Sequence, residues 1–282
     1  MQISLILLVF ALSGAGLTYY FTGLYQNLAF LIWFPLLLTI GYWIIGLALW
    51  LLYLIIISLF YKKDAPQKKI RWWVLWPMIE VCWIITNFFF VRIKVSNKEE
   101  LKKIKNKRFF LVCNHTSNLD QICVWSKFRR YKMITLSKPE LEKMPIIGKH
   151  MHRAGIVCID RDSPMKAIRA ISTSITLFKR EKKAGMAVYP EGTRHKDGVI
   201  QEFHSTPFLI PDKLKCPLVV MSIQNANKVK ERKYKKITNV YLDVVKVFDE
   251  EEVKKMNAQE MADISYKLIK ENLDKHEDRL YK

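Results

Sequence analysis

Two side chains with the chemistry of a general base lie five positions apart. His115 and Asp120 are the third and last residues of the run CNHTSNLD, which covers residues 113–120. A neutral imidazole, whose ordinary pKa is about 6.5, can take a proton from a hydroxyl group at neutral pH. It does so better when its other ring nitrogen donates to a fixed carboxylate. Asp120 follows His115 by about one helical turn, so the pair predicts a general base. The alternative is structural, with Asp120 as an acid in a first helical turn and His115 as a loop residue.

A second run offers groups that bind phosphate. It reads YPEGTR over residues 189–194 and follows an apolar segment. Gly192 allows close approach to the backbone, Thr193 supplies a hydroxyl, and the guanidinium of Arg194 can grip two phosphate oxygens at once. Glu191 can orient that arginine or a substrate hydroxyl. The alternative is a simple surface turn.

Two further segments are of interest. Residues 155–161 read GIVCIDR, a strand that ends in a second cation, Arg161. Residues 216–220 read CPLVV, an apolar stretch that is either structural or lines an acyl or thioester channel. Taken together, a base and a separate cradle of cations predict acyl transfer onto the hydroxyl of a phosphorylated glycerol.

The region that contains these runs alternates between strand-like and helix-like patterns. Ser117 or Asn118 is expected to cap the helix that follows His115. Such alternation predicts an α/β fold with a mixed central sheet flanked by helices. Strands are expected at residues 108–113, 132–136, 155–160, 186–189, 217–223 and 237–247, and helices at 120–128, 164–182 and 258–273, with a short helix opening at Pro139.

The first part of the chain predicts a membrane anchor. Residues 1–61 contain no Asp, Glu, Lys or Arg, and the apolar stretches 3–24 and 28–60 are each long enough to cross hydrocarbon. Residues 62–71 then carry five basic residues against Asp64 alone, which the positive-inside rule assigns to the cytoplasmic side. We therefore expect an integral membrane protein whose catalytic domain is cytoplasmic.

A tryptophan-rich segment at residues 72–91 follows the basic loop. It is expected to be a helix in the membrane interface, with a third membrane span as the alternative. The predicted organisation is a transmembrane region of two hydrophobic helices at 1–61, a basic loop and interfacial helix at 62–96, and the catalytic domain at 97–282.

The charge identifies the class of partner. The formal net charge of +20 belongs entirely to residues 62–282. Beside a membrane anchor, a basic surface attracts anionic lipid headgroups. Nucleic acid is not expected as a partner, because the chain has no recognisable nucleic-acid-binding motif or zinc-finger spacing.

The order of the four runs resembles a known family. The patterns Asn-His-x4-Asp, Gly-x3-Ile-Asp-Arg, Pro-Glu-Gly-Thr-Arg and Pro-Leu-Val-Val are similar to those of the glycerolipid acyltransferases, specifically the 1-acylglycerol-3-phosphate (lysophosphatidate) acyltransferases. The resemblance covers residues 95–225 approximately. One stretch departs from it: the family usually carries a Phe-Lys-x-Gly-Ala-like segment after the third pattern, whereas this chain reads EFHSTPF at 202–208.

The resemblance implies a role for each matched residue. His115 would be the general base and Asp120 its partner. The acceptor's phosphate would be held by Arg161, Glu191, Gly192, Thr193 and Arg194. The donor would be acyl-CoA or acyl-carrier protein, and the product of transfer to the sn-2 hydroxyl of lysophosphatidate would be phosphatidate.

We expect direct transfer, without a covalent acyl-enzyme, because the chain has no Gly-x-Ser-x-Gly elbow. A thioester needs no activation by a metal ion, so neither a metal nor a cofactor is expected. Three alternatives remain at this stage. The acceptor can be glycerol-3-phosphate, another lysophospholipid or a phosphorylated sugar lipid. The chain can instead be a non-catalytic, membrane-anchored binder of anionic lipids, or it can hydrolyse the thioester.

Overall fold

The computed structural model describes residues 2–23, 33–60, 69–137, 139–144, 147–159, 164–195, 199–232 and 236–281. The chain divides into two compact units. One comprises Met1–Pro66 with Pro145–His150, and the other comprises Gln67–Met144 with Met151–Lys282.

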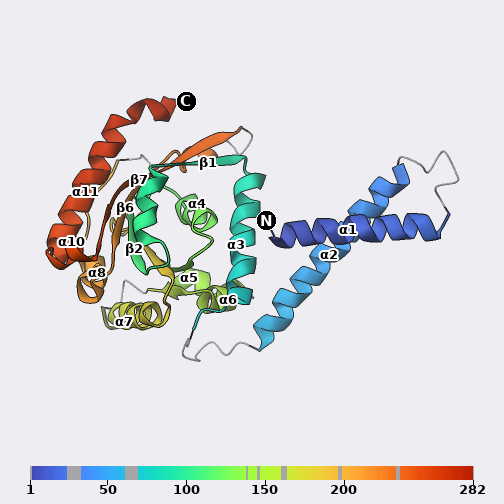
Figure 1. Cartoon of the computed structure of the whole chain (residues 1–282), viewed down its shortest axis with the longest axis horizontal. Coiled ribbons are helices and arrows are strands. Elements are labelled where there is room, and N and C mark those ends of the chain that lie inside the picture. The colour runs from blue at the N-terminus through green and yellow to red at the C-terminus, as the bar shows by residue number, and fades with distance from the viewer. Residues whose placement is uncertain are drawn as a thin grey trace. The chain divides into compact units, whose positions relative to one another are not determined.

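The first unit is built from two apolar helices, α1 (Gln2–Phe21) and α2 (Trp33–Leu59) (Figure 1). Most of their large hydrophobic side chains are exposed. Of the helices in the described ranges, only α2 is long and apolar enough to cross a membrane, because the apolar part of α1, Leu5–Phe21, is shorter. In the residues that the structure describes, both predicted apolar segments are helical.

Small residues let α1 and α2 approach closely. A Cβ atom added to Gly14 would lie 2.8 Å from the ring of Tyr42, and one added to Gly46 would lie 2.8 Å from Leu7. The hydroxyl groups of Thr18 and Tyr42 are 2.7 Å apart and hydrogen-bond across the contact. This is the close packing through small residues that is common between apolar helices.

The second unit is centred on one mixed sheet of seven strands (Figure 1). Their spatial order is β1-β7-β6-β2-β5-β3-β4. The five strands β2 to β6 run parallel to one another, β7 is antiparallel to β6, and β1 is parallel to β7. The strands are β1 (Val91–Ser96), β2 (Phe109–Cys113), β3 (Lys132–Ser137), β4 (Ile156–Cys158), β5 (Ala184–Val188), β6 (Leu218–Gln224) and β7 (Thr238–Phe248).

Helices cover both faces of the sheet. On one face α3 packs against α4, and on the other α8 packs on β2 while α11 packs along β6 and β7 (Figure 1). The helices of this unit are α3 (Trp72–Phe88), α4 (Leu119–Lys127), α5 (Pro139–Glu142), α7 (Pro164–Arg180), α8 (Leu209–Leu214), α9 (Lys228–Glu231), α10 (Glu250–Lys254) and α11 (Ala258–Lys275), with α6 (Ile147–Arg153) shared between the units and 3-10 turns η3 (Lys98–Ile104), η4 (Thr206–Phe208) and η5 (Glu277–Tyr281).

Strand β2 shows why the central strands read as continuous apolar runs. All five of its residues are buried, because a parallel sheet covered on both faces exposes neither side. Phe109 packs against Phe128 and Tyr131, with ring centroids 5.7 and 4.9 Å away. Its neighbour Phe110 points the other way and packs against Phe208 at 5.9 Å. The predicted α/β fold with a mixed sheet flanked by helices is confirmed.

Strand β1 was not predicted, and it lies at the end of the segment 62–96. This segment was assigned to a basic loop and interfacial helix outside the catalytic domain, yet α3 and β1 belong to the same compact unit as the sheet. The boundary at 96/97 falls directly after β1, which pairs with β7 along Val91–Ser96. Its sequence VRIKVS alternates apolar and polar residues, as expected of an edge strand protected by charged side chains.

The predicted tryptophan-rich helix is present as α3, and it has two different sides. One side is buried in the second unit through Val74, Leu75 and Ile79. The other exposes Trp73 and Phe88, which are 45% and 71% accessible. The exposed side fits the predicted interfacial position, which stays a prediction.

Candidate active site

The topology brings the two predicted runs to one edge of the sheet. Strands β2 and β5 are parallel neighbours, with Val112 opposite Val188. The residues that follow them, the His115 run and the Glu191 run, therefore leave the sheet side by side. Strand β4 is parallel to both and ends at the same edge. The predicted cation after β4, Arg161, lies outside the described residues.

A buried carboxylate organises the loop between β2 and α4. Asp120 has no exposed surface. One of its oxygens, Oδ2, accepts hydrogen bonds from the backbone N–H groups of Thr116 at 2.7 Å and Ser117 at 2.8 Å. The same oxygen lies 2.8 Å from Nδ1 of His115. Asp120, in the first turn of α4, thus holds together the loop that precedes this helix. The same carboxylate oxygen fixes the imidazole.

This contact also fixes the tautomer of His115. A carboxylate among N–H donors acts as an acceptor, so Nδ1 of the imidazole carries the hydrogen. The other ring nitrogen, Nε2, is then the basic one. The His115 side chain retains 20% of its accessible surface, so a substrate can reach it. The predicted pairing of His115 with Asp120 is present in the geometry that a general base requires.

The second run holds His115 by its backbone. Glu191 Oε1 accepts the N–H of His115 at 2.6 Å, and the N–H of His195 donates to the carbonyl of His115 at 2.9 Å. Oε2 of Glu191 accepts the N–H of Gln201 at 3.2 Å. Both carboxylate oxygens of Glu191 are therefore directed at backbone groups, and the side chain is 5% exposed. Burial raises the pKa of Glu191, and the two N–H donors offset part of that rise.

An aromatic ring fixes the plane of the imidazole. Tyr189 stacks on His115, with ring centroids 4.3 Å apart and an angle of 24° between the rings. Burial raises the pKa of the Tyr189 hydroxyl well above its ordinary value, so the stacked ring is neutral. Two backbone contacts, a carboxylate and a stacked ring thus determine where Nε2 of His115 points.

The cation of the second run lies beside the first run. The guanidinium of Arg194 donates to the side-chain oxygen of Asn118, three residues after His115. Asn118 takes the N-cap position of α4 but makes no side-chain capping hydrogen bond, so a cap by Asn118 is wrong. The hydroxyl of Ser117 accepts the N–H of Leu119 at 3.2 Å in a local turn before the helix. The predicted phosphate ligand and the predicted base therefore border the same loop.

The turn between Glu191 and Arg194 depends on glycine. Gly192 has φ +74°, a left-handed backbone that glycine adopts without strain. Thr193 is exposed, and its hydroxyl lies 3.0 Å from Nε2 of His195. A hydroxyl, a guanidinium and an imidazole thus project from consecutive residues next to His115.

Sequence reasoning missed several of the residues that position the base. Tyr189 had been assigned only the end of a strand, and His195 and Gln201 no role at all. In the departing stretch 202–208, Phe203 packs on Tyr266 with ring centroids 5.7 Å apart. In the run CPLVV, Leu218, Val219 and Val220 have no exposed surface and belong to the core of the sheet.

Part of the chain is similar in sequence to known proteins. Residues 92–224 match the sequence model of a family described as Acyltransferase. A 1-acyl-sn-glycerol-3-phosphate acyltransferase of Brassica napus is 32% identical over 168 residues, which is 59% of this chain and 46% of that protein. A protein of the same description from Arabidopsis thaliana is 27% identical over 168 residues, 59% of this chain and 44% of that one. The chain thus spans less than half the length of these two relatives.

A solved structure shares the fold. The crystal structure of the 1-acyl-sn-glycerophosphate acyltransferase PlsC from Thermotoga maritima superposes with a TM-score of 0.60. The match covers 80% of this chain and 87% of that one, at 20% sequence identity. At this identity the likeness shows the fold.

The raised pKa of Glu191 leads to a prediction about stability. A carboxyl group whose pKa is higher in the folded state than in the unfolded state stabilises the fold more as the pH falls. This contribution is complete below the unfolded pKa, about 4.3 for glutamate, and is lost as the pH rises through the folded pKa. The thermal midpoint of the wild type, minus that of Glu191→Gln, should therefore be larger at about pH 4 than at about pH 7.5.

The measurement is thermal unfolding of both proteins in the same detergent across this pH range. Both proteins contain the same other titratable groups, so the effect of those groups on stability cancels in the difference between the two midpoints. A difference that shrinks as the pH falls would mean that the two backbone donors outweigh burial, so that the pKa is lowered.

Proposed function

We propose that the chain transfers a fatty acyl group from a thioester to the sn-2 hydroxyl of lysophosphatidate, giving phosphatidate, a proposal that the match of residues 92–224 to the acyltransferase model supports. The observation that carries the proposal is the fixed orientation of His115. Its Nδ1 is bound to Asp120 at 2.8 Å, and no group in the described part of the chain hydrogen-bonds its Nε2. An imidazole held in this way is equipped to take a proton from an alcohol.

The proposed reaction is a direct transfer. Nε2 of His115 accepts the proton of the acceptor hydroxyl while that oxygen bonds to the thioester carbonyl carbon. The carbon–sulfur bond then breaks, and the imidazolium returns the proton to the departing thiolate. Proton transfer of this kind is worth about 10²–10⁴ in rate. The donor is acyl-CoA or acyl-carrier protein, and the scheme uses no metal or cofactor.

The nearby thiols support a scheme without an acyl-enzyme. Cys113 and Cys123 have no exposed surface. Burial raises the pKa of both thiols, and the neighbouring carboxylate of Asp120 raises them further. A nucleophilic cysteine needs the opposite environment, accessible and with a lowered pKa.

The proposed phosphate site combines Arg194, Thr193 and the backbone at Gly192 with Arg161. Arg194 and Thr193 come from the same turn, and Arg194 already borders the His115 loop through Asn118. The contacts of Glu191 favour a different role from the one that the resemblance implied. A carboxylate that accepts two backbone N–H groups positions the loops, and it would repel a phosphate.

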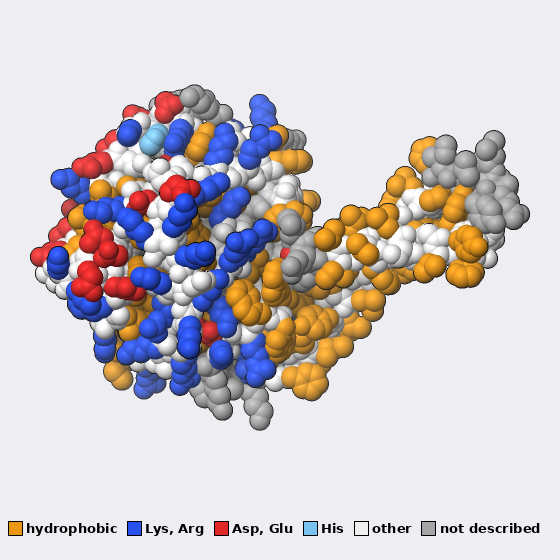
Figure 2. Space-filling view, in the orientation of Figure 1, with side chains coloured by type: hydrophobic (Ala, Val, Ile, Leu, Met, Phe, Trp, Pro, Cys, Tyr) orange, Lys and Arg blue, Asp and Glu red, His pale blue; other side chains and the backbone are white. Residues whose placement is uncertain are grey.

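We also propose that the protein is an integral membrane protein with its catalytic domain on the cytoplasmic side. The supporting observations are the length and apolar surface of α2, the exposed apolar side of α3 and the basic sequence of residues 62–71. Lysophosphatidate and phosphatidate both partition into bilayers, so an anchored enzyme meets its acceptor where it is concentrated. The basic surface of the second unit, visible in Figure 2, would attract anionic headgroups.

The function is tested with purified full-length protein in detergent or vesicles. Labelled acyl-CoA and acyl-carrier protein are offered with lysophosphatidate, glycerol-3-phosphate, lysophosphatidylcholine and no acceptor. We expect labelled phosphatidate from lysophosphatidate, and a fall of at least about 10²-fold in rate for His115→Ala, because the general base is lost. His204→Ala is a matched control outside the proposed base.

Each competing reading predicts a different result. Faster transfer to another acceptor would identify that molecule as the substrate. Release of thiol without an acceptor would indicate a hydrolase. If the protein turns over no thioester, the remaining interpretation is a non-catalytic binder of anionic lipids. His115→Ala with more than about a tenth of the wild-type rate would remove His115 from the role of base.

The phosphate site gives a second prediction. Arg194→Ala should lower kcat/KM for lysophosphatidate by about 10- to 100-fold, the usual value of a charge-assisted hydrogen bond. We expect transfer to monoacylglycerol, which has no phosphate, to be slow in the wild type and to change by less than about threefold in the variant. Arg130→Ala, an exposed arginine beyond the far end of α4, is the matched control. Equal losses with both acceptors would show that Arg194 does not contact the phosphate.

The membrane proposal is tested by alkaline carbonate extraction of membranes that contain the full-length chain. An integral protein stays in the pellet, and we expect this result because residues 1–61 contain no charge. A variant that lacks residues 1–61 should move largely to the supernatant. Release of the full-length chain by carbonate would contradict integral insertion.

A further inference from the structure

The residue before the proposed base has a contact that the mechanism does not use. Strands β2 and β6 pair as far as Cys113 and Met221. Beyond this point the side chain of Asn114 continues the ladder. Its Nδ2 donates to the carbonyl of Ile223 at 3.0 Å, and its Oδ1 accepts the N–H of Ile223 at 2.8 Å. The carboxamide imitates a peptide group, so the backbone can leave the sheet at His115 without losing this bond to β6.

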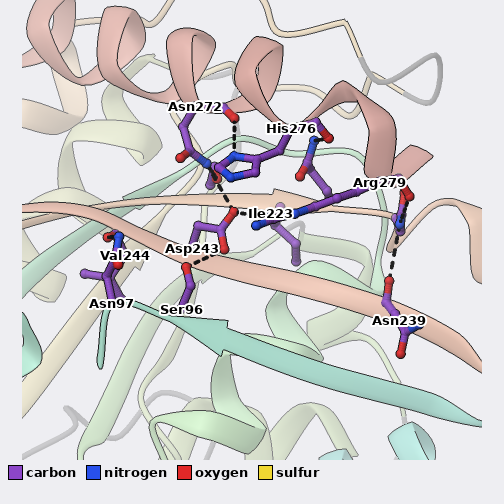
Figure 3. A network of polar contacts seen from close by, with 12 residues as sticks. Ser96, Asn97, Ile223, Asn239, Asp243, Val244, Asn272, His276 and Arg279 are labelled. Atoms are coloured by element: carbon purple, nitrogen blue, oxygen red, sulfur yellow. Dashed lines mark hydrogen bonds and ion pairs between the residues drawn. The ribbon is translucent and has the colours of Figure 1, made fainter. Parts of the chain in front are cut away.

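The same end of β6 is held by the C-terminal segment (Figure 3). Ser222 accepts a hydrogen bond from Nδ2 of Asn272 at 2.8 Å. The side chain of Gln224 donates to the carbonyl of His276 at 3.3 Å, and that of Asn225 to the carbonyl of Arg279 at 2.9 Å. Residues on both sides of Ile223 are thus bound by residues 272–279, while Ile223 itself binds Asn114.

A buried carboxylate anchors this segment. Asp243 of β7 lies opposite Ser222 and is 2% exposed. It accepts hydrogen bonds from Arg279, from Asn272 and from Ser96 of β1 (Figure 3). The guanidinium of Arg279 also lies 4.5 Å from the centre of the Tyr241 ring. Removing one partner of a buried ion pair leaves an uncompensated charge, so this attachment is costly to break.

These contacts form a continuous path from the C-terminal segment to the active site. We propose that Asn114 is a positioning residue for His115, and that residues 272–279 act through it by fixing the end of β6. The inference rests on the proposed function of His115. When Asp243 loses Arg279, the end of β6 loosens, Ile223 shifts against Asn114, and His115 moves relative to Asp120 and the substrate. A displacement of about 1 Å at a reacting group can cost about 10² in rate.

The experiment compares kcat and KM of the full-length wild type, Asn114→Ala, Arg279→Ala and Arg279→Lys. Asn257→Ala is the matched control, because Asn257 caps the other end of α11 and its loss costs about 1 kcal/mol. All assays are run well below the lowest thermal midpoint. We expect Asn114→Ala and Arg279→Ala to lower kcat at least about tenfold with KM within twofold. Arg279→Lys should recover part of kcat, and Asn257→Ala should keep it.

Hydrogen exchange of the same proteins, read by mass spectrometry, gives a measurement that does not depend on turnover. Peptides covering residues 109–118 and 218–226 should exchange faster in Arg279→Ala than in Asn257→Ala. Equal exchange in these two variants, or an equal fall in kcat, would overturn the proposal and leave the segment a purely structural element. If Asn114→Ala does not fold, Asn272→Ala takes its place. If the wild type transfers no acyl group, the proposed function fails, and hydrogen exchange alone decides whether the segment controls the end of β2.

Discussion

The structure of the site depends on one buried carboxylate. Asp120 has no exposed surface, and a carboxylate without water is tolerated only when N–H donors surround it. Those donors come from Thr116, Ser117 and His115, all within the loop that Asp120 closes. The loop cannot change shape without leaving the charge unsatisfied. The orientation of the imidazole is therefore a consequence of the loop's stability, and it exists before any substrate binds.

A second carboxylate connects the loop after β2 to the loop after β5. Glu191 follows β5, and it accepts the N–H of His115 at the end of β2. The bond from His195 to the carbonyl of His115 runs in the opposite direction. Two loops that are 76 residues apart in sequence thus behave as one body.

The parts of this arrangement that depend on neighbouring residues in the chain could be predicted from the sequence. Apolar and alternating runs located six of the seven strands to within two residues at each end. The parallel pairing of β2 with β5, which the sequence did not specify, brings the His115 and Arg194 runs to one edge. The contacts that were missed depend on register between distant strands. Nothing near Asn114 in the sequence indicates Ile223, 109 residues away, and the stack of Tyr189 on His115 depends on how β2 and β5 are aligned. Strand β1 was missed because its short alternating pattern follows directly on a strongly helical segment.

The basic surface follows from the excess of 46 lysines and arginines over 26 aspartates and glutamates, and internal ion pairs do not alter that excess. Several of the chain's carboxylates are buried and satisfied by internal donors. Glu181, for example, accepts the N–H of Ile70 and pairs with Lys132, while Asp243 pairs with Arg279. Each of these pairs removes one cation and one carboxylate from the surface together, so the remaining lysines and arginines still carry the whole excess of positive charge (Figure 2). The field of the net charge of +20 extends over about one Debye length, near 8 Å at physiological salt, and favours anionic partners.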